Sequence, residues 1–298
     1  MNYNPSIPIF PAGRQIDLSD KPLLDRIFST LQPRVSELSF AGLYLFRKAH
    51  DYRLTMISDS LAILGKGYDG QARFLPPLTG DIRNALGILF GSGMQLYGAD
   101  EKFADLFLAD QGLLVTEDRD SFDYLYHRSD LAELPGNRFH KKKNRINYFT
   151  ARHNHTVELF TEQFSGGCLE LLAEWQRVKG GEESASARLE AEATAEAIVM
   201  ASCLGLDGVV VLVDERVKAF ALGERLNSHT SVCHFEKSDP FMEGISQLVD
   251  MEFNRLLFTE CKYVNREQDL GEPGLRGAKL SYHPVELVRK FQARRVVL

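Results

Sequence analysis

The sequence predicts a mixed α/β protein, and three observations support that class. Segments with the alternating or continuous apolar pattern of strands recur along the chain, and segments with helical spacing separate them. The composition, 44% hydrophobic and 26% charged residues, is that of an ordinary globular protein. The length of 298 residues is enough for two domains of ordinary size or one large domain. We therefore expect sheets with buried cores, flanked by helices.

The first half of the chain alternates strands with helices. Two short strands are expected over residues 52–64, and a third over 71–75 before the Pro76-Pro77 break. Apolar spacing then predicts helices over residues 81–90 and 99–108, a strand over 123–126 and a short helix over 129–134.

The second half has the same style and contains the clearest helix. Apolar residues mark one helix face over residues 189–204, which Gly205 ends as a C-cap. The apolar run 209–213 predicts a buried central strand, and short connections make its two successors antiparallel to it. The other expected elements are a helix over 166–179, an exposed linker over 180–184, strands over 217–222 and 230–236, a helix from Asp239-Pro240 to residue 258, a strand at 263–264, a short helix that ends at Tyr282, and a last strand over 285–294.

Net charge, apolar runs and cysteine content indicate the cellular compartment and the classes of partner to expect. A formal net charge of −6 argues against a chain coated with nucleic acid, because phosphate neutralisation needs a large basic surface. No apolar run reaches the roughly 18 to 20 residues that span a bilayer, and the first residues lack a signal-peptide pattern. The four cysteines are widely spaced, so neither a zinc ribbon nor a disulfide framework is expected. We expect a cytoplasmic protein with buried thiols and no stable membrane insertion.

One basic run is a local exception to the acidic balance. Residues 140–145, HKKKNR, carry four formal positive charges in six residues. Such a run is either the solvated face of a helix or a site for phosphate or carboxylate. In the second case Lys142, Lys143 and Arg145 are the candidate substrate-binding residues.

The segment 263–284, YVNREQDLGEPGLRGAKLSYHP, contains more polar chemistry than a connector needs. Asn265, Arg266, Glu267 and Asp269 follow the end of a short strand, where a rigid sheet positions side chains that substrate can reach. Arg266 offers a fork for a carboxylate or phosphate. The alternative is an internal Arg266–Glu267–Asp269 salt-bridge network that only fixes the turn.

Several segments together resemble one known family. They are HFEK at 234–237, NREQDLGEPGLRGAKLSYHP at 265–284, and DYLY with GNRFHKKKNRINYF at 123–126 and 136–149. These segments look like the DUF2156 family, which is similar to the C-terminal domain of phosphatidylglycerol lysyltransferase. The resemblance implies a transferase with two GNAT-like domains in tandem, over residues 1–160 and 161–298. Each domain would be a mixed, mostly antiparallel sheet flanked by helices.

The resemblance also implies roles for individual residues. In GNAT enzymes an Asn after the fifth strand and an Ala-x-x-x-Tyr helix line the reaction centre, and Asn265 with residues 278–282 resemble these parts. Tyr282 would be the general acid, or else a half-buried aromatic residue. Glu236 and Glu267 are the candidate bases, and either could instead bind the ammonium of an aminoacyl group. Further candidate substrate-binding residues are Lys237, Asn265, Arg266, Asp269, Arg276 and Lys279.

The expected donor follows from the loop after Glu236. GNAT enzymes hold the pyrophosphate of acyl-coenzyme A on a glycine-rich loop, whereas residues 236–244 here contain Asp239, Pro240 and Glu243. Acetyl-coenzyme A is therefore less favoured than an aminoacyl-tRNA as donor, and no cofactor is required. No metal is expected, because His153 and His155 lack a third ligand at suitable spacing.

The predicted function is transfer of an aminoacyl or acyl group to an amine or hydroxyl by direct attack. The expected acceptor is a small molecule or peptide, because no amphipathic basic helix is evident that would dock the chain on a lipid surface. The alternatives are an acyl-coenzyme A-dependent N-acetyltransferase and a non-catalytic ligand-binding protein. The oligomeric state stays open.

Overall fold

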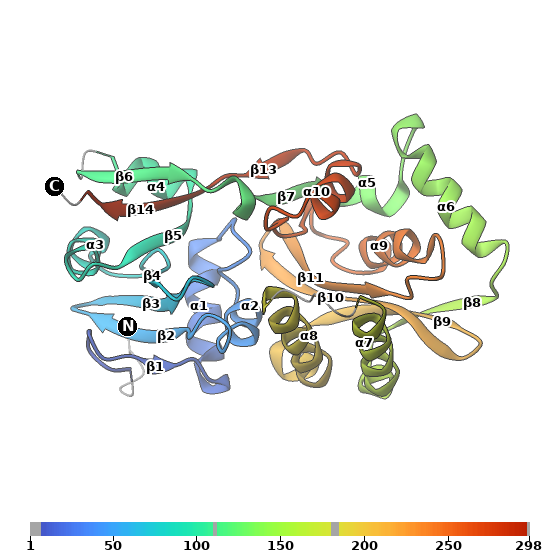
Figure 1. The fold of residues 1–298 in the computed structure, drawn as a ribbon, viewed down its shortest axis with the longest axis horizontal. Helices are drawn as coiled ribbons and strands as arrows, with labels where there is room; N and C mark the ends of the chain where they lie inside the picture. Colours follow the sequence, from blue (N-terminus) through green and yellow to red (C-terminus); the bar gives the residue numbers. More distant parts are fainter. Residues whose placement is uncertain (1–6, 110–111, 180–184, 297–298) are drawn as a thin grey trace. The chain divides into compact units, whose positions relative to one another are not determined.

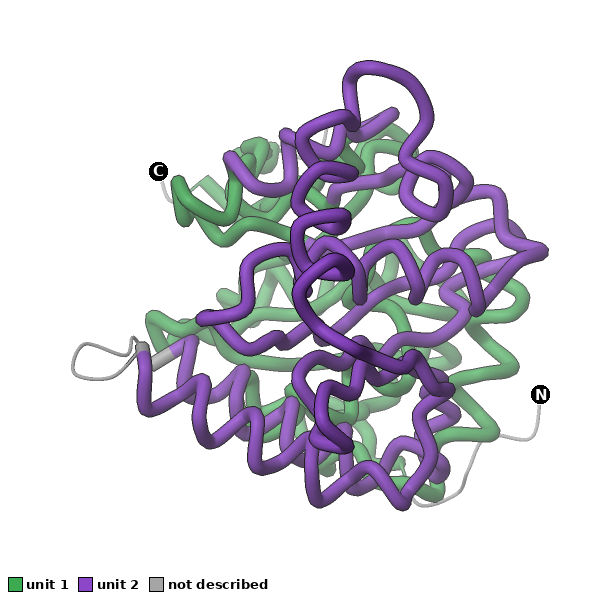
Figure 2. Tube along the Cα trace, turned by 90° about the vertical axis from the view of Figure 1, so that its right-hand side faces the viewer, with its two compact units in different colours: residues 1–123, 268–276, 287–298 green, residues 124–267, 277–286 purple. Residues whose placement is uncertain are grey.

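The computed structural model describes residues 7–109, 112–179 and 185–296, and within them it contains two seven-stranded sheets with helices packed against them (Figure 1). Contacts divide the chain into two compact units, shown in different colours in Figure 2. Unit 1 consists of residues 1–123, 268–276 and 287–298, and unit 2 of residues 124–267 and 277–286. The division predicted at residue 160 falls within unit 2. The predicted linker over 180–184 lies outside the described residues.

The first sheet is mixed and mostly antiparallel. Its order is β1-β2-β3-β4-β5-β14-β6, and the β4–β5 pair is parallel. Helix α3 connects these two parallel strands. The strands are β1 (Arg14–Gln15), β2 (Arg53–Ile57), β3 (Ser60–Lys66), β4 (Ala72–Phe74), β5 (Gln95–Asp100), β6 (Leu113–Glu117) and β14 (Lys290–Arg295).

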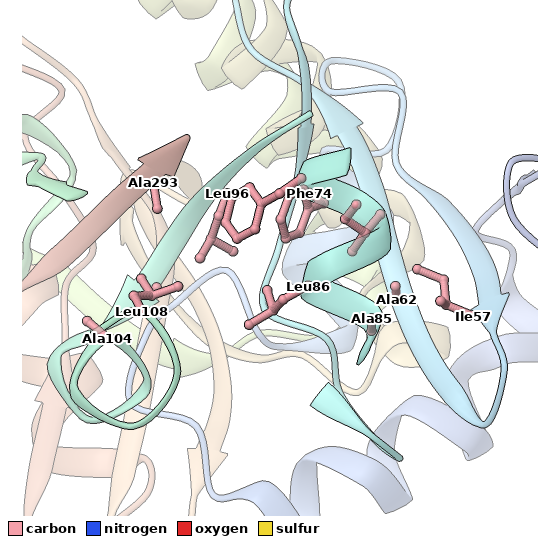
Figure 3. Close-up of a cluster of buried hydrophobic side chains, with 12 residues drawn as sticks. Ile57, Ala62, Phe74, Ala85, Leu86, Leu96, Ala104, Leu108 and Ala293 are labelled. Carbon is pink, nitrogen blue, oxygen red and sulfur yellow. The ribbon is translucent and has the colours of Figure 1, made fainter. Parts of the chain in front are cut away.

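One buried hydrophobic cluster of unit 1 lies between this sheet and the helices α3 and α4. Phe74 and Leu96 from β4 and β5 pack with Leu86, Leu89 and Phe90 of α3, and all five side chains are buried (Figure 3). Such burial contributes roughly 1.5–3 kcal/mol for each large apolar side chain. The helices of this unit are α1 (Lys21–Leu31), α2 (Phe40–Leu45), α3 (Ile82–Gly91) and α4 (Glu101–Phe107).

Unit 1 also buries a lysine with two carboxylates. The Nζ atom of Lys290 lies 2.6 and 2.7 Å from the two carboxylate oxygens of Glu37 and 2.7 Å from Oδ1 of Asp123. The side chains of Lys290 and Asp123 are fully buried. Burial raises the pKa of Glu37 to about 7, although Lys290 opposes this rise. The three groups therefore form a desolvated ion cluster, in which the removal of one charge would leave another buried without a partner charge.

The second sheet is also mixed and mostly antiparallel. Its order is β13-β7-β12-β11-β10-β9-β8, and β11 pairs with β12 in parallel. The predicted antiparallel arrangement of β9, β10 and β11 is confirmed. The strands are β7 (Asp123–His127), β8 (His155–Leu159), β9 (Asp207–Val213), β10 (Arg216–Asn227), β11 (Thr230–Ser238), β12 (Tyr263–Asn265) and β13 (Glu286–Val288).

Helices cover both faces of this sheet (Figure 1). Consecutive residues of a strand point to opposite faces. Glu236 of β11 points toward α9, whereas Lys237 contacts Trp175 of α7 and Glu190 of α8. Helices α5 and α6 pack against α9. The helices are α5 (Arg128–Glu133), α6 (His140–Thr150), α7 (Ser165–Lys179), α8 (Ala185–Leu204), α9 (Ile245–Leu256) and α10 (Pro273–Leu280), and single 3₁₀ turns lie at Leu18–Asp20, Arg119–Ser121, Asn137–Phe139 and Glu162–Phe164.

Three element predictions are wrong in informative ways. Asp239 does not begin a helix: its carboxylate accepts the Phe241 N–H at 2.9 Å and pairs with Lys218, and α9 starts only after Gly244. The last predicted strand is two strands, β13 and β14, that belong to different sheets. The helix predicted over 99–108 starts at Glu101, because the preceding residues complete β5.

Candidate functional site

The parallel strands of unit 2 pair only near their starts. Their register runs from Thr230 opposite Tyr263 to Val232 opposite Asn265, where β12 ends. Strand β11 continues for six more residues, to Ser238. Along this stretch β12 no longer pairs with β11, and the side chain of Arg266 instead donates a hydrogen bond to the side chain of Glu236 on β11. The site therefore lies where two parallel strands stop pairing, and a guanidinium occupies it.

Arg266 lies between two carboxylates. Its Nη2 atom is 2.6 Å from Oε2 of Glu236, and its Nη1 atom is 3.1 Å from Oδ2 of Asp250 on α9. The Asp250 side chain is only 3% exposed. Tyr282 completes this side, because its side chain interacts electrostatically with Asp250 and its ring centroid lies 5.2 Å from the guanidinium carbon of Arg266. The pair with Glu236 is also a hydrogen bond, whereas the buried Oδ2 atom of Asp250 is compensated by the charge of Arg266 rather than by a hydrogen bond.

Lys142 adds a second cation from α6. Its Nζ atom lies 3.8 Å from the centroid of the Tyr282 ring and donates a hydrogen bond to Oγ of Ser281 at 2.7 Å. Its side chain is partly buried, whereas the neighbouring Lys141 and Lys143 are exposed. We call the following five residues the charged cluster: Lys142, Glu236, Asp250, Arg266 and Tyr282.

Burial moves two pKa values of the charged cluster toward neutrality. It raises the pKa of Glu236 to about 7, against the opposing effect of Arg266, and lowers the pKa of Lys142 to about 8. It also raises the pKa of Asp250. Burial disfavours the charge of Arg266, but Asp250 and Glu236 outweigh it and keep the pKa well above its usual value. The cluster thus contains a carboxyl and an ammonium that can each exchange a proton near neutral pH, as acid–base catalysis requires.

A β-bulge in β11 turns His234 toward two other carboxylates. The register with β10 passes from Leu222–Phe235 to Gly223–Cys233, which leaves His234 as the extra residue. Its Nδ1 atom lies 2.8 Å from Oε1 of Glu267 and its Nε2 atom 2.9 Å from Oε1 of Glu224. Burial disfavours the imidazolium, but these two hydrogen bonds outweigh it and raise the pKa of His234 to about 10. Both ring nitrogens therefore donate, and the ring is positively charged at neutral pH.

His234 should make stability depend on pH in the alkaline range. Its folded pKa of about 10 exceeds the ordinary value of 6.5, so its contribution is complete below pH 6.5 and is lost as pH rises through about 10. We expect His234→Gln to lower the free energy of unfolding by about 3 kcal/mol at about pH 6 and to remove most of the alkaline decline. Urea denaturation at several pH values measures both effects.

His229 provides the matched control, because it is an exposed histidine in the turn immediately before the same strand. His229→Gln should change the free energy of unfolding by less than about 0.5 kcal/mol and keep the alkaline decline of the wild type. A His234→Gln protein with the full alkaline decline would show that this imidazolium is not its source.

Two predicted binding residues hold the backbone of the site. Oδ1 of Asn265 accepts the N–H of Glu267 at 2.7 Å. Nζ of Lys279 donates to the carbonyl oxygens of Arg266, at 2.6 Å, and of Glu267, at 3.1 Å. Glu267 has a positive φ of 55°, a conformation that a non-glycine residue adopts only where its surroundings hold it. These hydrogen bonds direct Arg266 and Glu267 toward their different partners.

Asp269 and Arg276 belong to a separate ion cluster in unit 1. The buried Asp269 carboxylate accepts from Arg276 at 2.7 and 2.9 Å and lies 3.2 Å from Arg119. It also accepts the N–H of Gly271 at 2.9 Å, so it closes the turn before α10. Arg266, Glu267 and Asp269 therefore pair with three different sets of partners rather than with one another.

The structure gathers only part of the predicted site. Glu236, Arg266, Tyr282 and Lys142 meet in the charged cluster, and Glu267 pairs with His234. The other predicted residues lie elsewhere. Lys237 is on the opposite face of the sheet, and Lys143 and Arg145 are exposed on α6. Asp269 and Arg276 pair at the turn before α10, and the side chains of Asn265 and Lys279 hydrogen-bond backbone atoms of Arg266 and Glu267. Their roles in catalysis and binding stay predictions.

Three residues of these clusters were not among the predicted site residues: Asp250, His234 and Glu224. Asp250 follows Leu248 and Val249 on the buried side of α9, so a carboxylate amid apolar spacing was the available signal. His234 stood in the HFEK segment, which served only to support the family resemblance. Glu224 gave no signal, because the bulge that brings it to His234 is not visible in the sequence.

Histidines and cysteines outside these clusters have packing roles or are exposed. The rings of His153 and His155 contact Phe149, at centroid distances of 4.9 and 5.3 Å. Among the described residues, no group of three or more His, Cys, Asp or Glu side chains is arranged to hold a metal ion. All four cysteines are free thiols, and the expectation that all are buried is wrong for Cys203, which is exposed on α8. None of the helices described here combines the length and apolar character needed to cross a bilayer.

Solved structures place the fold in the GNAT-like class of α/β proteins. A tandem GNAT protein from the clavulanic acid biosynthesis pathway aligns with a TM-score of 0.52 at 10% identity, over 96% of this chain and 99% of its own. The L-PGS structure from Bacillus licheniformis aligns with a TM-score of 0.66 at 13% identity, over 96% and 94%. A conserved protein of unknown function from Bacteroides thetaiotaomicron is 31% identical, with a TM-score of 0.87 over 94% and 98%.

The chain belongs to the family described as phosphatidylglycerol lysyltransferase, C-terminal, which matches residues 28–294. The resemblance drawn from the sequence is thereby confirmed, and the family makes this chain a transferase of the aminoacyltransferase kind. No curated protein matches the chain.

Proposed function

We propose that this protein transfers an aminoacyl group from an aminoacyl-tRNA to an amine or hydroxyl of a small molecule or peptide. The reaction site is the charged cluster, and the fold is two GNAT-like repeats. The observation that carries the proposal is a largely buried Glu236–Arg266–Asp250 array where β11 and β12 stop pairing, with Asp250 buried and Glu236 and Arg266 partly exposed, in a member of an aminoacyltransferase family. The two sheets support the repeats, because each has one parallel pair connected by a helix, β4–α3–β5 and β11–α9–β12.

The loop between β11 and α9 favours aminoacyl-tRNA over acyl-coenzyme A as donor. A pyrophosphate cradle needs backbone N–H groups that are free to face the anion. Here the N–H groups of Asp239, Phe241, Met242 and Ile245 are already bonded within the protein, and Pro240 has none. The Asp239 and Glu243 carboxylates add negative charge to the same loop. These residues do not fit the pyrophosphate of acyl-coenzyme A.

The proposed chemical step is direct attack on the aminoacyl ester. The acceptor nitrogen or oxygen forms a bond to the ester carbonyl carbon, and the bond from that carbon to the ribose oxygen breaks. Glu236 accepts the proton that the nucleophile loses, because its pKa of about 7 keeps it partly ionised at neutral pH. Lys142, with a pKa of about 8, gives a proton to the leaving ribose oxygen. Solvent then restores both groups.

Tyr282 is assigned a positioning role in this scheme. Burial and the neighbouring Asp250 carboxylate raise the pKa of its hydroxyl well above the ordinary value, so it keeps its proton at neutral pH. Its ring lies under Lys142 and near Arg266, so it separates and orients the two cations. We therefore assign the acid role to Lys142 rather than to Tyr282 in the proposed reaction.

A second candidate function, a non-catalytic ligand-binding protein, is favoured by one observation. Glu236 and Glu267 are each engaged in an ion pair and are only partly exposed, and Tyr282 is buried beside Asp250. A binding module would keep these pairs intact when its ligand binds. A catalytic site must open at least the Glu236 pair to admit the nucleophile.

Single-turnover transfer assays test the proposal. Excess protein is mixed with tRNAs charged with different radiolabelled amino acids, and with soluble amines, peptides or phosphatidylglycerol vesicles as acceptors. Label is expected to move from tRNA to a soluble acceptor, without added coenzyme A. Label transfer to the vesicles alone would replace the proposed acceptor by a lipid. Acetyl transfer from acetyl-coenzyme A without aminoacyl transfer would establish the N-acetyltransferase instead, and no transfer from any donor would favour the binding module.

A further inference from the structure

We propose that the exposed face of α6 is the docking surface for the 3′ end of the donor tRNA. This inference rests on the proposed function and assigns the residues that hold the donor outside the reaction site. We call this surface the α6 face: Lys141, Arg145 and Tyr148 share one exposed side of the helix, Lys143 lies on a second exposed side, and Arg152 follows the last residue of the helix, Thr150.

The first argument is charge. The sequence of α6, HKKKNRINYFT, has four formal positive charges and no carboxylate, in a chain whose net charge is −6. Lys141 and Lys143 are exposed, and Arg145 is 56% exposed with a long ion pair of 3.8 Å to Glu243. Exposed pairs of this kind contribute little and exchange readily for a stronger anion. The α6 face is therefore a concentrated cationic surface on an acidic protein, which fits a phosphate backbone.

The second argument is aromatic exposure beside these cations. Tyr148 is 44% exposed, and the guanidinium carbon of Arg152 lies 3.6 Å from the centroid of its ring. The loop after β11 contacts α6 closely at Gly244 and presents Phe241, which is 79% exposed. Aromatic side chains among cations are how proteins stack the bases of single-stranded nucleic acid. The 3′ end of a tRNA is such a single strand.

The third argument is the connection to the reaction site. Lys142 belongs to the same helix but points to the charged cluster, where it lies over Tyr282. A helix of 11 residues is roughly 16 Å long, enough to follow several nucleotides of one strand. Helix α6 thus presents exposed cations to the phosphates of the RNA, and it also places Lys142 in the charged cluster, where the aminoacyl ester would react.

The composition of α6 favours RNA over a lipid surface. Interfacial helices insert an apolar stripe below the headgroups. The apolar residues of α6, Ile146 and Phe149, are buried within the protein. The face that remains outside is cationic with a single tyrosine, and it lacks a stripe to insert.

Binding of an uncharged RNA hairpin tests the inference without requiring turnover. The probe has a tRNA acceptor stem and its single-stranded 3′ end, with a fluorophore at the 5′ end, and anisotropy gives Kd at several salt concentrations. The triple variant K141Q/K143Q/R145Q should weaken binding by at least about tenfold and reduce the slope of log Kd against log salt by about 2 to 3. Tyr148→Ala should weaken binding about 5- to 100-fold, and only for hairpins that keep the single-stranded end.

The matched control replaces three exposed cations elsewhere, in K102Q/R177Q/K262Q. It changes net charge equally and should keep the wild-type Kd and salt slope. Circular dichroism verifies that every variant is folded. Equal weakening by both triples, or loss of binding to anionic vesicles but not to the hairpin, would overturn the inference.

The transfer assay separates this inference from the proposed function. Transfer that proceeds normally with both triples would refute the α6 face and leave the function standing. Hairpin binding that depends on the α6 face, without transfer from any charged tRNA, would refute the function and leave the docking surface. Where both hold, the α6 triple should raise KM for the charged tRNA more than it lowers kcat.

Discussion

Replacing Glu236 with glutamine is expected to lower the rate of aminoacyl transfer by about 10²- to 10⁴-fold, the usual contribution of a general base. Glutamine keeps the size of the side chain and can still face Arg266, but it cannot accept a proton. Wild-type activity should rise with pH through about 7 as Glu236 ionises, because burial raises its pKa to that value. Single-turnover rates at saturating protein across pH measure this acidic limb, which the variant should lack.

The alkaline limb of the same pH–rate profile tests the role of Lys142 independently. Lys142 must be protonated to act as the acid, so activity should fall through about pH 8 as it loses its proton. The expected optimum therefore lies between about pH 7 and 8. Lys142→Gln should remove the alkaline limb and leave the acidic one.

Glu243 is the matched control for Glu236, because it is a carboxylate in the loop that follows β11 and its side chain is 60% exposed. Glu243→Gln should retain both limbs and most of the activity. A Glu236→Gln enzyme that keeps its acidic limb would assign the base to another group, with Glu267 next to be tested.

Replacing Lys290 with methionine should destabilise the protein by about 3–5 kcal/mol at about pH 8, because Glu37 and Asp123 would be left as uncompensated buried charges. The loss should be smaller at about pH 5, because burial raises the pKa of Glu37 and its carboxyl group can then be neutral. Already in the wild type, the raised pKa of Glu37 means that its contribution to stability is present below about 4.5 and is lost as pH rises through about 7. Urea denaturation at both pH values measures the difference.

Arg289 offers a control one residue away. It pairs with Glu101 and Glu117, and all three side chains are exposed. Arg289→Gln should cost less than about 1 kcal/mol at either pH. Adding Glu37→Gln and Asp123→Asn to Lys290→Met should recover a large part of the loss, because the unpaired charges are removed as well. A Lys290→Met protein no less stable than Arg289→Gln would show that this cluster contributes nothing net.

Local patterns predicted much of unit 2 because its elements are locally determined. The apolar face of α8 and the Gly205 cap place its end at Leu204, and the continuous apolar run of β9 matches a strand buried on both faces. Short connections made β9, β10 and β11 antiparallel. In contrast, the expected helix start at Asp239 failed, because Lys218 on β10 and a local turn hold that carboxylate instead.

The basic run lies on a helix that the element predictions did not include. Residues 140–150, whose cations the sequence left open as either a solvated helix face or an anion site, form α6 with these cations largely exposed. Only Ile146 and Phe149 of this helix are buried, which is too few to give a clear apolar pattern in the sequence. Packing against α9 supplies the contacts that stabilise it.

The sequence by itself determined the mixed α/β class, most of the strongly patterned elements, the family, and the segment 263–284 as a place where polar groups gather. Tertiary structure alone decided which of these groups meet. Arg266 and Glu236 are 30 residues apart, and they pair because two parallel strands stop pairing between them. Because side chains alternate along β11, Lys237 lies on the opposite face of the sheet from Glu236. A one-residue bulge orients His234 so that it pairs with Glu224 and Glu267. Such contacts depend on strand register and on desolvation over long separations, which local sequence patterns do not encode.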